Sequence, residues 1–203
     1  MTDASIAAAY DARAAEYVDV AGDIAQMDAA DRTLIARWRD ATTGPLLDAG
    51  CGPGPWTSFL HDGHRDVVGV DISEQFIEAA RERHPHLRFD VGSFRALPYE
   101  DATLGGILAW YSLIHTPPAD LPAVFAEFAR VLAPGGALLI GFFDGTSRRV
   151  FDHAVTTAYF WSPNDLRSLL AEAGFTVTRH ERRERSGDEV SIRPHGAVVA
   201  VKR

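Results

Sequence analysis

The fold is decided by one stretch of sequence, Leu46-Leu47-Asp48-Ala49-Gly50-Cys51-Gly52-Pro53-Gly54. Its apolar start is typical of a buried strand, and its glycines predict a sharp turn that runs into a helix. Glycine allows positive φ and lets a ligand approach the main chain closely, while N–H groups at the helix start face that ligand. A glycine triplet of this kind is weak evidence for a binding site when it stands alone.

A second apolar segment ends in an acidic residue at an informative spacing from the glycine turn. Residues 67–70 are valine or glycine, and the segment ends in Asp71, 21 residues after Gly50. A carboxylate in that position can accept hydrogen bonds from both hydroxyls of a ribose. The order of strand, glycine turn, helix, strand and acid predicts a nucleoside-binding half-fold. The alternative is a structural turn followed by an aspartate that caps a helix.

Short apolar runs alternate with amphipathic stretches along most of the chain, which predicts an α/β doubly wound sheet within a single domain, residues 1–203. The runs predicted as parallel strands are residues 46–49, 67–72, 87–91, 107–111 and 137–143. Helices are expected over 4–20, 29–40, 73–83, 121–132 and 163–173. Residues 175–179 and 197–201 predict an antiparallel hairpin at the sheet edge, joined by a charged, solvated connection that includes residues 180–185.

Composition and charge exclude several classes of protein. The net charge of −8 disfavours nucleic acid as a partner, because a phosphate backbone is repelled. The single cysteine, Cys51, excludes disulfides and cysteine-based metal clusters within one chain, and the spacing of the histidines and acids predicts no metal site. The chain shows neither a signal-peptide pattern nor an apolar stretch near the roughly 18 residues of a membrane helix. We therefore expect a cytoplasmic protein with no membrane partner.

Five motifs in chain order resemble those of the class I S-adenosylmethionine-dependent methyltransferases, of the type that acts on small molecules. The resemblance implies a three-layer, Rossmann-like sheet of seven strands, mostly parallel with the last strand antiparallel. It also implies S-adenosylmethionine as the methyl donor, S-adenosylhomocysteine as the product and a small-molecule acceptor. The motifs are residues 48–54, Val70-Asp71-Ile72-Ser73, Leu97-Pro98-Tyr99-Glu100-Asp101, Arg130-Val131-Leu132-Ala133-Pro134-Gly135-Gly136 and Leu170-Ala171-Glu172-Ala173-Gly174-Phe175.

The resemblance also implies where the cofactor binds. Gly50 and Gly52 are expected against its methionine part, Asp71 on the ribose and Ile72 on the adenine. Many relatives have Gly-Asp-Ala after the third strand, where this chain departs with Gly92-Ser93-Phe94. A carboxylate just before the glycines favours an ammonium group or its water shell. The full expected set is Tyr17, Asp48, Gly50, Gly52, Asp71, Ile72, Ser93, Phe94, Ala109 and Trp110, under N-terminal helices formed by residues 1–42.

Two other functions stay open at this point. A nicotinamide-dependent oxidoreductase requires a third glycine at position 55, where this chain has Pro55, and its only lysine is Lys202. A non-catalytic module that binds S-adenosylmethionine is compatible with every motif. The fourth-strand segment, Ala109-Trp110-Tyr111-Ser112, differs from the Asn/Asp-Pro-Pro-Tyr type of relatives that methylate amide or base nitrogens.

Methyl transfer by in-line displacement requires alignment of the acceptor and, for a protonated oxygen, a base. His115 follows the fourth strand and is the candidate base, because imidazole titrates near neutral pH; the alternative is a histidine that caps the next helix. Residues 142–161 are a candidate lid, with a solvated amphipathic helix as the alternative. The candidate acceptor-binding residues are Tyr10, Tyr111, Arg148, Arg149 and His153, and core packing is the alternative for the N-terminal tyrosines. The identity of the acceptor and the oligomeric state stay open.

Overall fold

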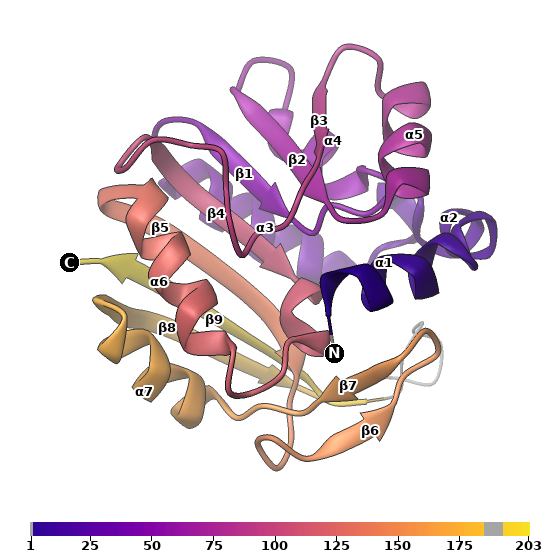
Figure 1. The fold of residues 1–203 in the computed structure, drawn as a ribbon. Coiled ribbons are helices and arrows are strands. Elements are labelled where there is room, and N and C mark those ends of the chain that lie inside the picture. The colour runs from indigo at the N-terminus through magenta and orange to yellow at the C-terminus, as the bar shows by residue number, and fades with distance from the viewer. Residues whose placement is uncertain (1, 185–192) are drawn as a thin grey trace.

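A seven-stranded sheet forms the centre of the computed structural model, which describes residues 2–184 and 193–203 (Figure 1). The strand order is β3-β2-β1-β4-β5-β9-β8. Neighbouring strands are parallel except at β9, which is antiparallel to both β5 and β8. This confirms the predicted mixed sheet with one antiparallel strand. The bounds are Leu46–Ala49 for β1, Val67–Asp71 for β2, Arg88–Val91 for β3, Leu104–Trp110 for β4, Leu132–Phe143 for β5, Phe175–Arg183 for β8 and His195–Lys202 for β9.

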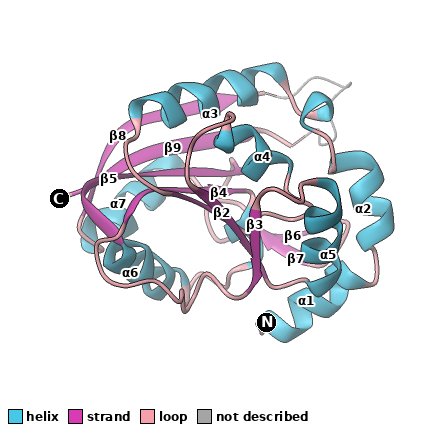
Figure 2. Cartoon of the chain, turned by 90° about the horizontal axis from the view of Figure 1, so that it is seen from above, coloured by secondary structure: helices cyan, strands magenta, loops and turns pink. Residues whose placement is uncertain are grey.

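Helices cover both faces of the sheet (Figure 2). On one face lie α3 (Ala29–Ala41), α4 (Pro55–His61) and α5 (Glu74–Arg83), and on the other lie α6 (Leu121–Val131) and α7 (Pro163–Glu172). Successive side chains of a strand point to opposite faces, so Leu46 packs in the α3–α4 core and Leu47 in the α6–α7 core. Burial on both faces explains why the central strands read as almost continuous apolar runs.

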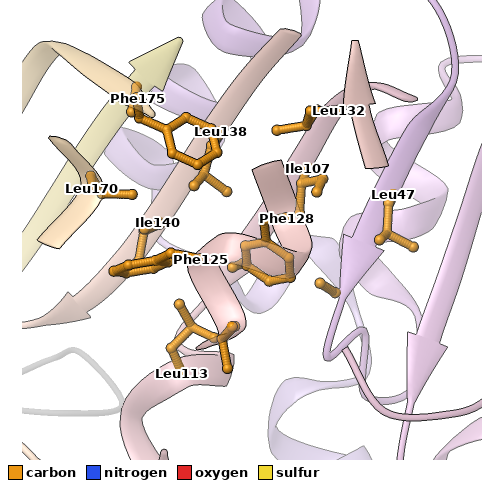
Figure 3. Close-up of a cluster of buried hydrophobic side chains, with 14 of the residues drawn as sticks. Leu47, Ile107, Leu113, Phe125, Phe128, Leu132, Leu138, Ile140, Leu170 and Phe175 are labelled. Carbon is orange, nitrogen blue, oxygen red and sulfur yellow. The ribbon is translucent and has the colours of Figure 1, made fainter. Parts of the chain in front are cut away.

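The largest apolar cluster fills the space between the sheet and helices α6 and α7 (Figure 3). Phe125 and Phe128 project from α6 and are fully buried against strand residues such as Ile107 and Leu138. The helix carries apolar residues on one stripe, as its 3.6-residue period requires. This core stabilises the sheet, and the candidate site lies at the ends of its strands.

Smaller elements gather at the carboxyl ends of the parallel strands. They are α1 (Asp3–Asp11), α2 (Ala14–Ala21), the 3-10 helices η1 (Ile24–Gln26) and η2 (Ser112–His115), and the strands β6 (Val150–Asp152) and β7 (Thr157–Tyr159). Strands β6 and β7 pair antiparallel, so the segment expected as a lid or an amphipathic helix is a hairpin, and the helix alternative is wrong. Figure 1 shows α1 beside this hairpin, and the Arg13 guanidinium donates to the Ala154 carbonyl there.

The C-terminal hairpin is longer than expected. Strand β8 continues to Arg183, where charged side chains occupy the exposed positions, and Arg183 pairs with Asp28 and Asp31. The rest of the predicted connection, including Arg185, lies outside the described residues. None of the helices in residues 2–184 and 193–203 is long and apolar enough to span a bilayer.

Truncation of the core side chain in Phe128→Ala is expected to lower the free energy of unfolding by about 3–5 kcal/mol, because it leaves a cavity in the α6–α7 core. Urea denaturation monitored by circular dichroism measures the loss. The exposed Val150→Ala is the matched control and is expected to change stability by less than about 0.5 kcal/mol. A loss below about 1 kcal/mol for Phe128→Ala would contradict the described packing.

Candidate active site

A cavity of about 380 Å³ opens at the carboxyl ends of β1, β2 and β4. In open α/β sheets this edge is where ligands bind. Its wall combines the glycine turn after β1, the end of β2, the segment after β3, η2, helices α1 and α2, and the β6–β7 hairpin. The volume falls in the usual range of small-molecule pockets. The cavity is therefore the candidate active site.

The glycine turn presents main chain rather than side chains to this cavity. Gly50 has φ of 79°, and a Cβ there would lie 2.3 Å from the Ser112 Cβ, so only glycine fits. Gly52 has φ of 54°, and a Cβ there would have Phe76 at 4.0 Å as its nearest neighbour. The backbone N–H groups of Gly50 and Cys51 both donate to the Val70 carbonyl, which ties the turn to β2. Both predicted glycines line the cavity.

Asp71 lines the cavity and joins two segments of its wall. Its Oδ2 accepts the Gly52 N–H and its Oδ1 accepts the Ser73 N–H, both at 2.9 Å. Burial raises the pKa of this carboxyl, and these backbone hydrogen bonds oppose the rise. Each carboxylate oxygen has a further lone pair. The carboxylate can thus accept hydrogen bonds from two adjacent ligand hydroxyls while it holds the turn.

The predicted adenine-side residues line the same cavity: Ile72 follows Asp71, and Ser93 and Phe94 follow β3. The Ser93 hydroxyl donates to Asp3 Oδ2 at 2.5 Å and accepts the Arg95 N–H at 3.1 Å. Its proton is committed to Asp3, so only a lone pair is left for a ligand donor. Phe76, which is not among the predicted site residues, also lines the cavity from α5.

Two of the predicted cofactor residues lie behind the cavity wall. Asp48 is 1% exposed, and its Oδ2 accepts the Thr57 hydroxyl at 2.7 Å. Ala109 is fully buried and packs in the α6–α7 core. Neither lines the cavity, because the strand directs the Asp48 side chain toward α4 and the Ala109 side chain into the core. Direct contact between these side chains and a ligand is not supported, whereas Trp110 does line the cavity.

The candidate base His115 is 3% exposed and is hydrogen-bonded through both ring nitrogens. Its Nδ1 lies 2.7 Å from the Thr157 carbonyl, and its Nε2 lies 2.9 Å from the Tyr10 hydroxyl. Because a carbonyl only accepts, Nδ1 must carry the proton. Burial lowers the pKa of His115, which favours the neutral ring. His115 therefore bonds to β7 and α1, and it does not cap the following helix as the alternative supposed.

Aromatic rings surround His115 at this end of the cavity. The His153 ring lies 5.2 Å from the His115 ring, and burial, with a smaller effect of His115, lowers the pKa of His153 to about 4. The centroids of the Tyr111 and Phe143 rings lie 4.9 Å apart, and the Tyr111 hydroxyl forms a hydrogen bond with His195 Nδ1. Tyr111 also has φ of 57°, a strained conformation that is concentrated at functional sites. Tyr10, Tyr111 and His153 thus share the cavity, as predicted.

The predicted arginine pair is not part of the cavity. Arg148 and Arg149 are exposed in the loop before β6 and do not line it. The cavity is lined instead by Arg13 after α1, Arg95 after β3 and Arg193 before β9. Sequence reasoning missed all three, because the tertiary fold brings them together from distant segments.

The N-terminal helices are attached to the wall by polar contacts. Asp11 accepts the Ser73 hydroxyl at 2.5 Å, and Asp3 pairs with Arg95 at 2.8 Å. Tyr10 and Tyr17 pack against each other at 5.9 Å. Within the described part of the chain, no group of three or more histidine, cysteine or acidic side chains is arranged to hold a metal.

The buried Asp48 predicts a pH dependence of stability. Burial raises its pKa to about 7 from an ordinary 3.8, so the folded protein keeps a proton that the unfolded chain releases. The stability from this group is full below about pH 4 and is lost as the pH rises to about 7. Asp48→Asn is expected to remove this loss of stability at rising pH, and its amide oxygen can still accept the Thr57 hydroxyl.

Urea denaturation at pH 5 and pH 8 tests this expectation. The stability difference between the two pH values is expected to shrink by about 2.5 kcal/mol in Asp48→Asn, since about two pH units of titration each contribute about 1.36 kcal/mol. The exposed Asp66→Asn is the control and is expected to keep the wild-type difference. Equal pH dependence in wild type and Asp48→Asn would show that Asp48 is ionised in the fold.

The chain resembles known methyltransferases in sequence. A family model described as a methyltransferase domain matches residues 46–136. The malonyl-[acyl-carrier protein] O-methyltransferase of Serratia marcescens is 31% identical over 135 residues, which are 66% of this chain and 51% of that protein. O-methyltransferase cnsE of Penicillium expansum is 31% identical over 169 residues, 74% of this chain and 58% of that protein. The chain spans about half the length of these curated relatives.

The fold is also that of a solved methyltransferase. The Burkholderia thailandensis 1,6-didemethyltoxoflavin-N1-methyltransferase, with bound 1,6-didemethyltoxoflavin and S-adenosylhomocysteine, matches with a TM-score of 0.76 and 21% identity. The match covers 100% of this chain and 91% of that chain, and at this identity it shows the fold alone. The family-model match spans the glycine turn and Asp71. Residues 46–136 therefore match a methyltransferase domain, and the fold of the chain is that of a solved methyltransferase with bound S-adenosylhomocysteine.

Proposed function

We propose that this protein transfers a methyl group from S-adenosylmethionine to a small-molecule acceptor. The observation that carries the proposal is the Asp71 carboxylate, which faces the cavity while it holds the open glycine turn. That arrangement suits a ribose, because its two hydroxyls can donate to the carboxylate while the rest of the ligand lies close to the main chain of the turn. The names of the two curated relatives, both O-methyltransferases, favour an oxygen acceptor.

The residues of the cavity fit the cofactor. Asp71 would hold the ribose hydroxyls, and Gly50 and Gly52 leave room for the methionine part against the main chain. Ile72 and Phe94 would pack on the adenine, with Ser93 beside them. When bound, S-adenosylmethionine supplies an electrophilic methyl group on a positively charged sulfur. Tyr17 and Trp110 complete the proposed binding set.

The chain's own residues would then align the acceptor and exclude water. Helices α1 and α2 are proposed to cover the cofactor, and the β6–β7 hairpin is proposed to close over the acceptor. Arg13, between α1 and α2, already contacts the Ala154 carbonyl in the hairpin. Holding two reactants in line removes much of the entropic barrier of a bimolecular displacement. Tyr10, Tyr111 and His153 are proposed to border the acceptor.

A small acceptor is favoured by the size and charge of the molecule. A cavity of about 380 Å³ has little room for a macromolecular segment beside the cofactor. The net charge of −8 opposes long-range attraction of a nucleic acid.

Isothermal titration calorimetry tests the cofactor. Micromolar binding of S-adenosylhomocysteine and no binding of NADH are expected. Asp71→Asn is expected to weaken S-adenosylhomocysteine by about 10- to 100-fold, the scale of hydrogen bonds to a charged group. The exposed Asp66→Asn is the charge-matched control and should bind like wild type. Binding of NADH alone, or an unchanged affinity for S-adenosylhomocysteine in Asp71→Asn, would contradict the proposal that this cavity binds S-adenosylmethionine through Asp71.

Mass spectrometry tests the transfer itself. The protein is incubated with S-adenosylmethionine and separate panels of hydroxyl, carboxyl, amine and thiol compounds. A product heavier by one methylene, formed together with S-adenosylhomocysteine, is expected in at least one panel. Tight binding of S-adenosylhomocysteine with no product in any panel would favour a binding module without transferase activity.

A further inference from the structure

The hydrogen-bond directions around His115 restrict what the cavity can bind. The Thr157 carbonyl fixes the proton on Nδ1, so Nε2 is the acceptor in the neutral ring. The Tyr10 hydroxyl lies 2.9 Å from Nε2 and must donate to it. Burial also raises the pKa of Tyr10 well above its ordinary value, so the phenol keeps its proton. The only proton of Tyr10 is committed to His115, and its oxygen has just lone pairs for a ligand.

His115 and Tyr10 both line the cavity, and the Tyr10 hydroxyl occupies the lone pair of His115 Nε2. His115 is 3% exposed and its second nitrogen is bonded to the hairpin. Tyr10 lines the cavity from α1. A ligand can therefore exchange a proton with Nε2 through the Tyr10 oxygen while this hydrogen bond is in place.

We propose that the acceptor's nucleophile is a hydroxyl group and that its proton passes through Tyr10 to His115. This inference rests on the proposed function and names the acceptor class for the same site. Tyr10 is the catalytic residue that touches the acceptor, and His115 acts through it. Among the oxygen acceptors of the proposed function, a hydroxyl can donate its proton to the Tyr10 oxygen, whereas a carboxylate has no proton to donate and would meet the lone pairs of Tyr10.

The transfer balances in atoms and charge. The acceptor oxygen forms a bond to the methyl carbon, and the carbon–sulfur bond breaks with its electron pair on sulfur. The hydroxyl proton moves to the Tyr10 oxygen, and the Tyr10 proton moves to His115 Nε2. The imidazolium then donates through Nδ1 to Thr157 and through Nε2 to Tyr10. One positive charge is lost from sulfur and one appears on His115, so the buried cavity keeps its net charge.

The groups that face His115 come from three elements. They are Tyr10 from α1, the Thr157 carbonyl from β7, and His153 from the hairpin turn. His153, with its pKa lowered to about 4, is neutral at pH 7 and adds no repulsion. Arg13 and Arg193 oppose charging of His153 and border the same end of the cavity. The carbonyl is the group that directly stabilises the imidazolium.

The first test reads the His115 tautomer and needs no acceptor. Nitrogen-15 NMR of the histidine-labelled protein with bound S-adenosylhomocysteine is expected to show a protonated Nδ1 and a bare Nε2 at pH 7.5. His115→Gln assigns the resonances, and Tyr10→Phe is expected to shift Nε2 because its hydrogen bond is lost. A protonated Nε2 would overturn the inference, because that nitrogen would have no lone pair for the proton.

The second test compares turnover of catechol, as a hydroxyl probe, with benzoate and thiophenol. Turnover of catechol above both other probes is expected. Tyr10→Phe and His115→Gln are expected to lower kcat about 10²- to 10⁴-fold, with the affinity for S-adenosylhomocysteine unchanged. Tyr99→Phe, whose side chain does not line the cavity, is the matched control and should keep wild-type kcat.

A pH profile separates proton transfer from simple positioning. Activity is expected to fall on the acid side, as His115 becomes protonated, at a pH below the ordinary imidazole range because its pKa is lowered. That acid limb should vanish in His115→Gln.

Methylation of benzoate or thiophenol alone, or full kcat in Tyr10→Phe, would overturn the inference and leave the proposed methyltransferase function intact. Failure of S-adenosylhomocysteine to bind would instead contradict the function. If none of the three probes is turned over, the hydroxyl, carboxyl and thiol panels of the transfer test replace them, and product is expected in the hydroxyl panel.

Discussion

The site depends on one carboxylate that performs two tasks. Asp71 accepts the N–H of Gly52 from the turn after β1 and the N–H of Ser73 at the start of α5. These bonds fix the geometry of the glycine turn and of the start of α5, which directly follow the neighbouring parallel strands β1 and β2. They also hold a buried carboxylate against the cavity, where burial alone would favour its neutral form. Turn, strand end and helix start are therefore positioned by the same side chain that is proposed to bind the ribose.

A second polar centre connects the outer walls of the cavity. His115 bonds to Tyr10 on α1 and to Thr157 on β7, so one buried ring joins the N-terminal helices to the β6–β7 hairpin. Both walls are built from short elements outside the main core, which makes this connection important for closing the cavity. The same ring supplies the proton acceptor in the proposed chemistry. Closure and proton transfer are thus linked through one hydrogen-bonded pair.

Local patterns predicted what depends on local sequence. The alternation of apolar runs gave the seven strands, and the glycine turn with Asp71 gave the residues on one side of the cavity. Strand alternation placed Asp48 and Ala109 behind the wall, although their positions in the motifs suggested contact. The partners of His115 lie 105 and 42 residues away in the chain, so no spacing reveals them. The hairpin was hidden because its strands have only three residues each, and because the charged residues just before β6, Arg148 and Arg149, are typical of a surface helix.

A crystal structure with S-adenosylhomocysteine tests the central claim most directly. The account predicts that the two ribose hydroxyls lie within hydrogen-bonding distance of the Asp71 carboxylate, with the homocysteine part against Gly50 and Gly52. It also predicts that Asp71 keeps its bonds to the Gly52 and Ser73 N–H groups. A ligand bound elsewhere, or in this cavity with no contact between its ribose and Asp71, would contradict the account.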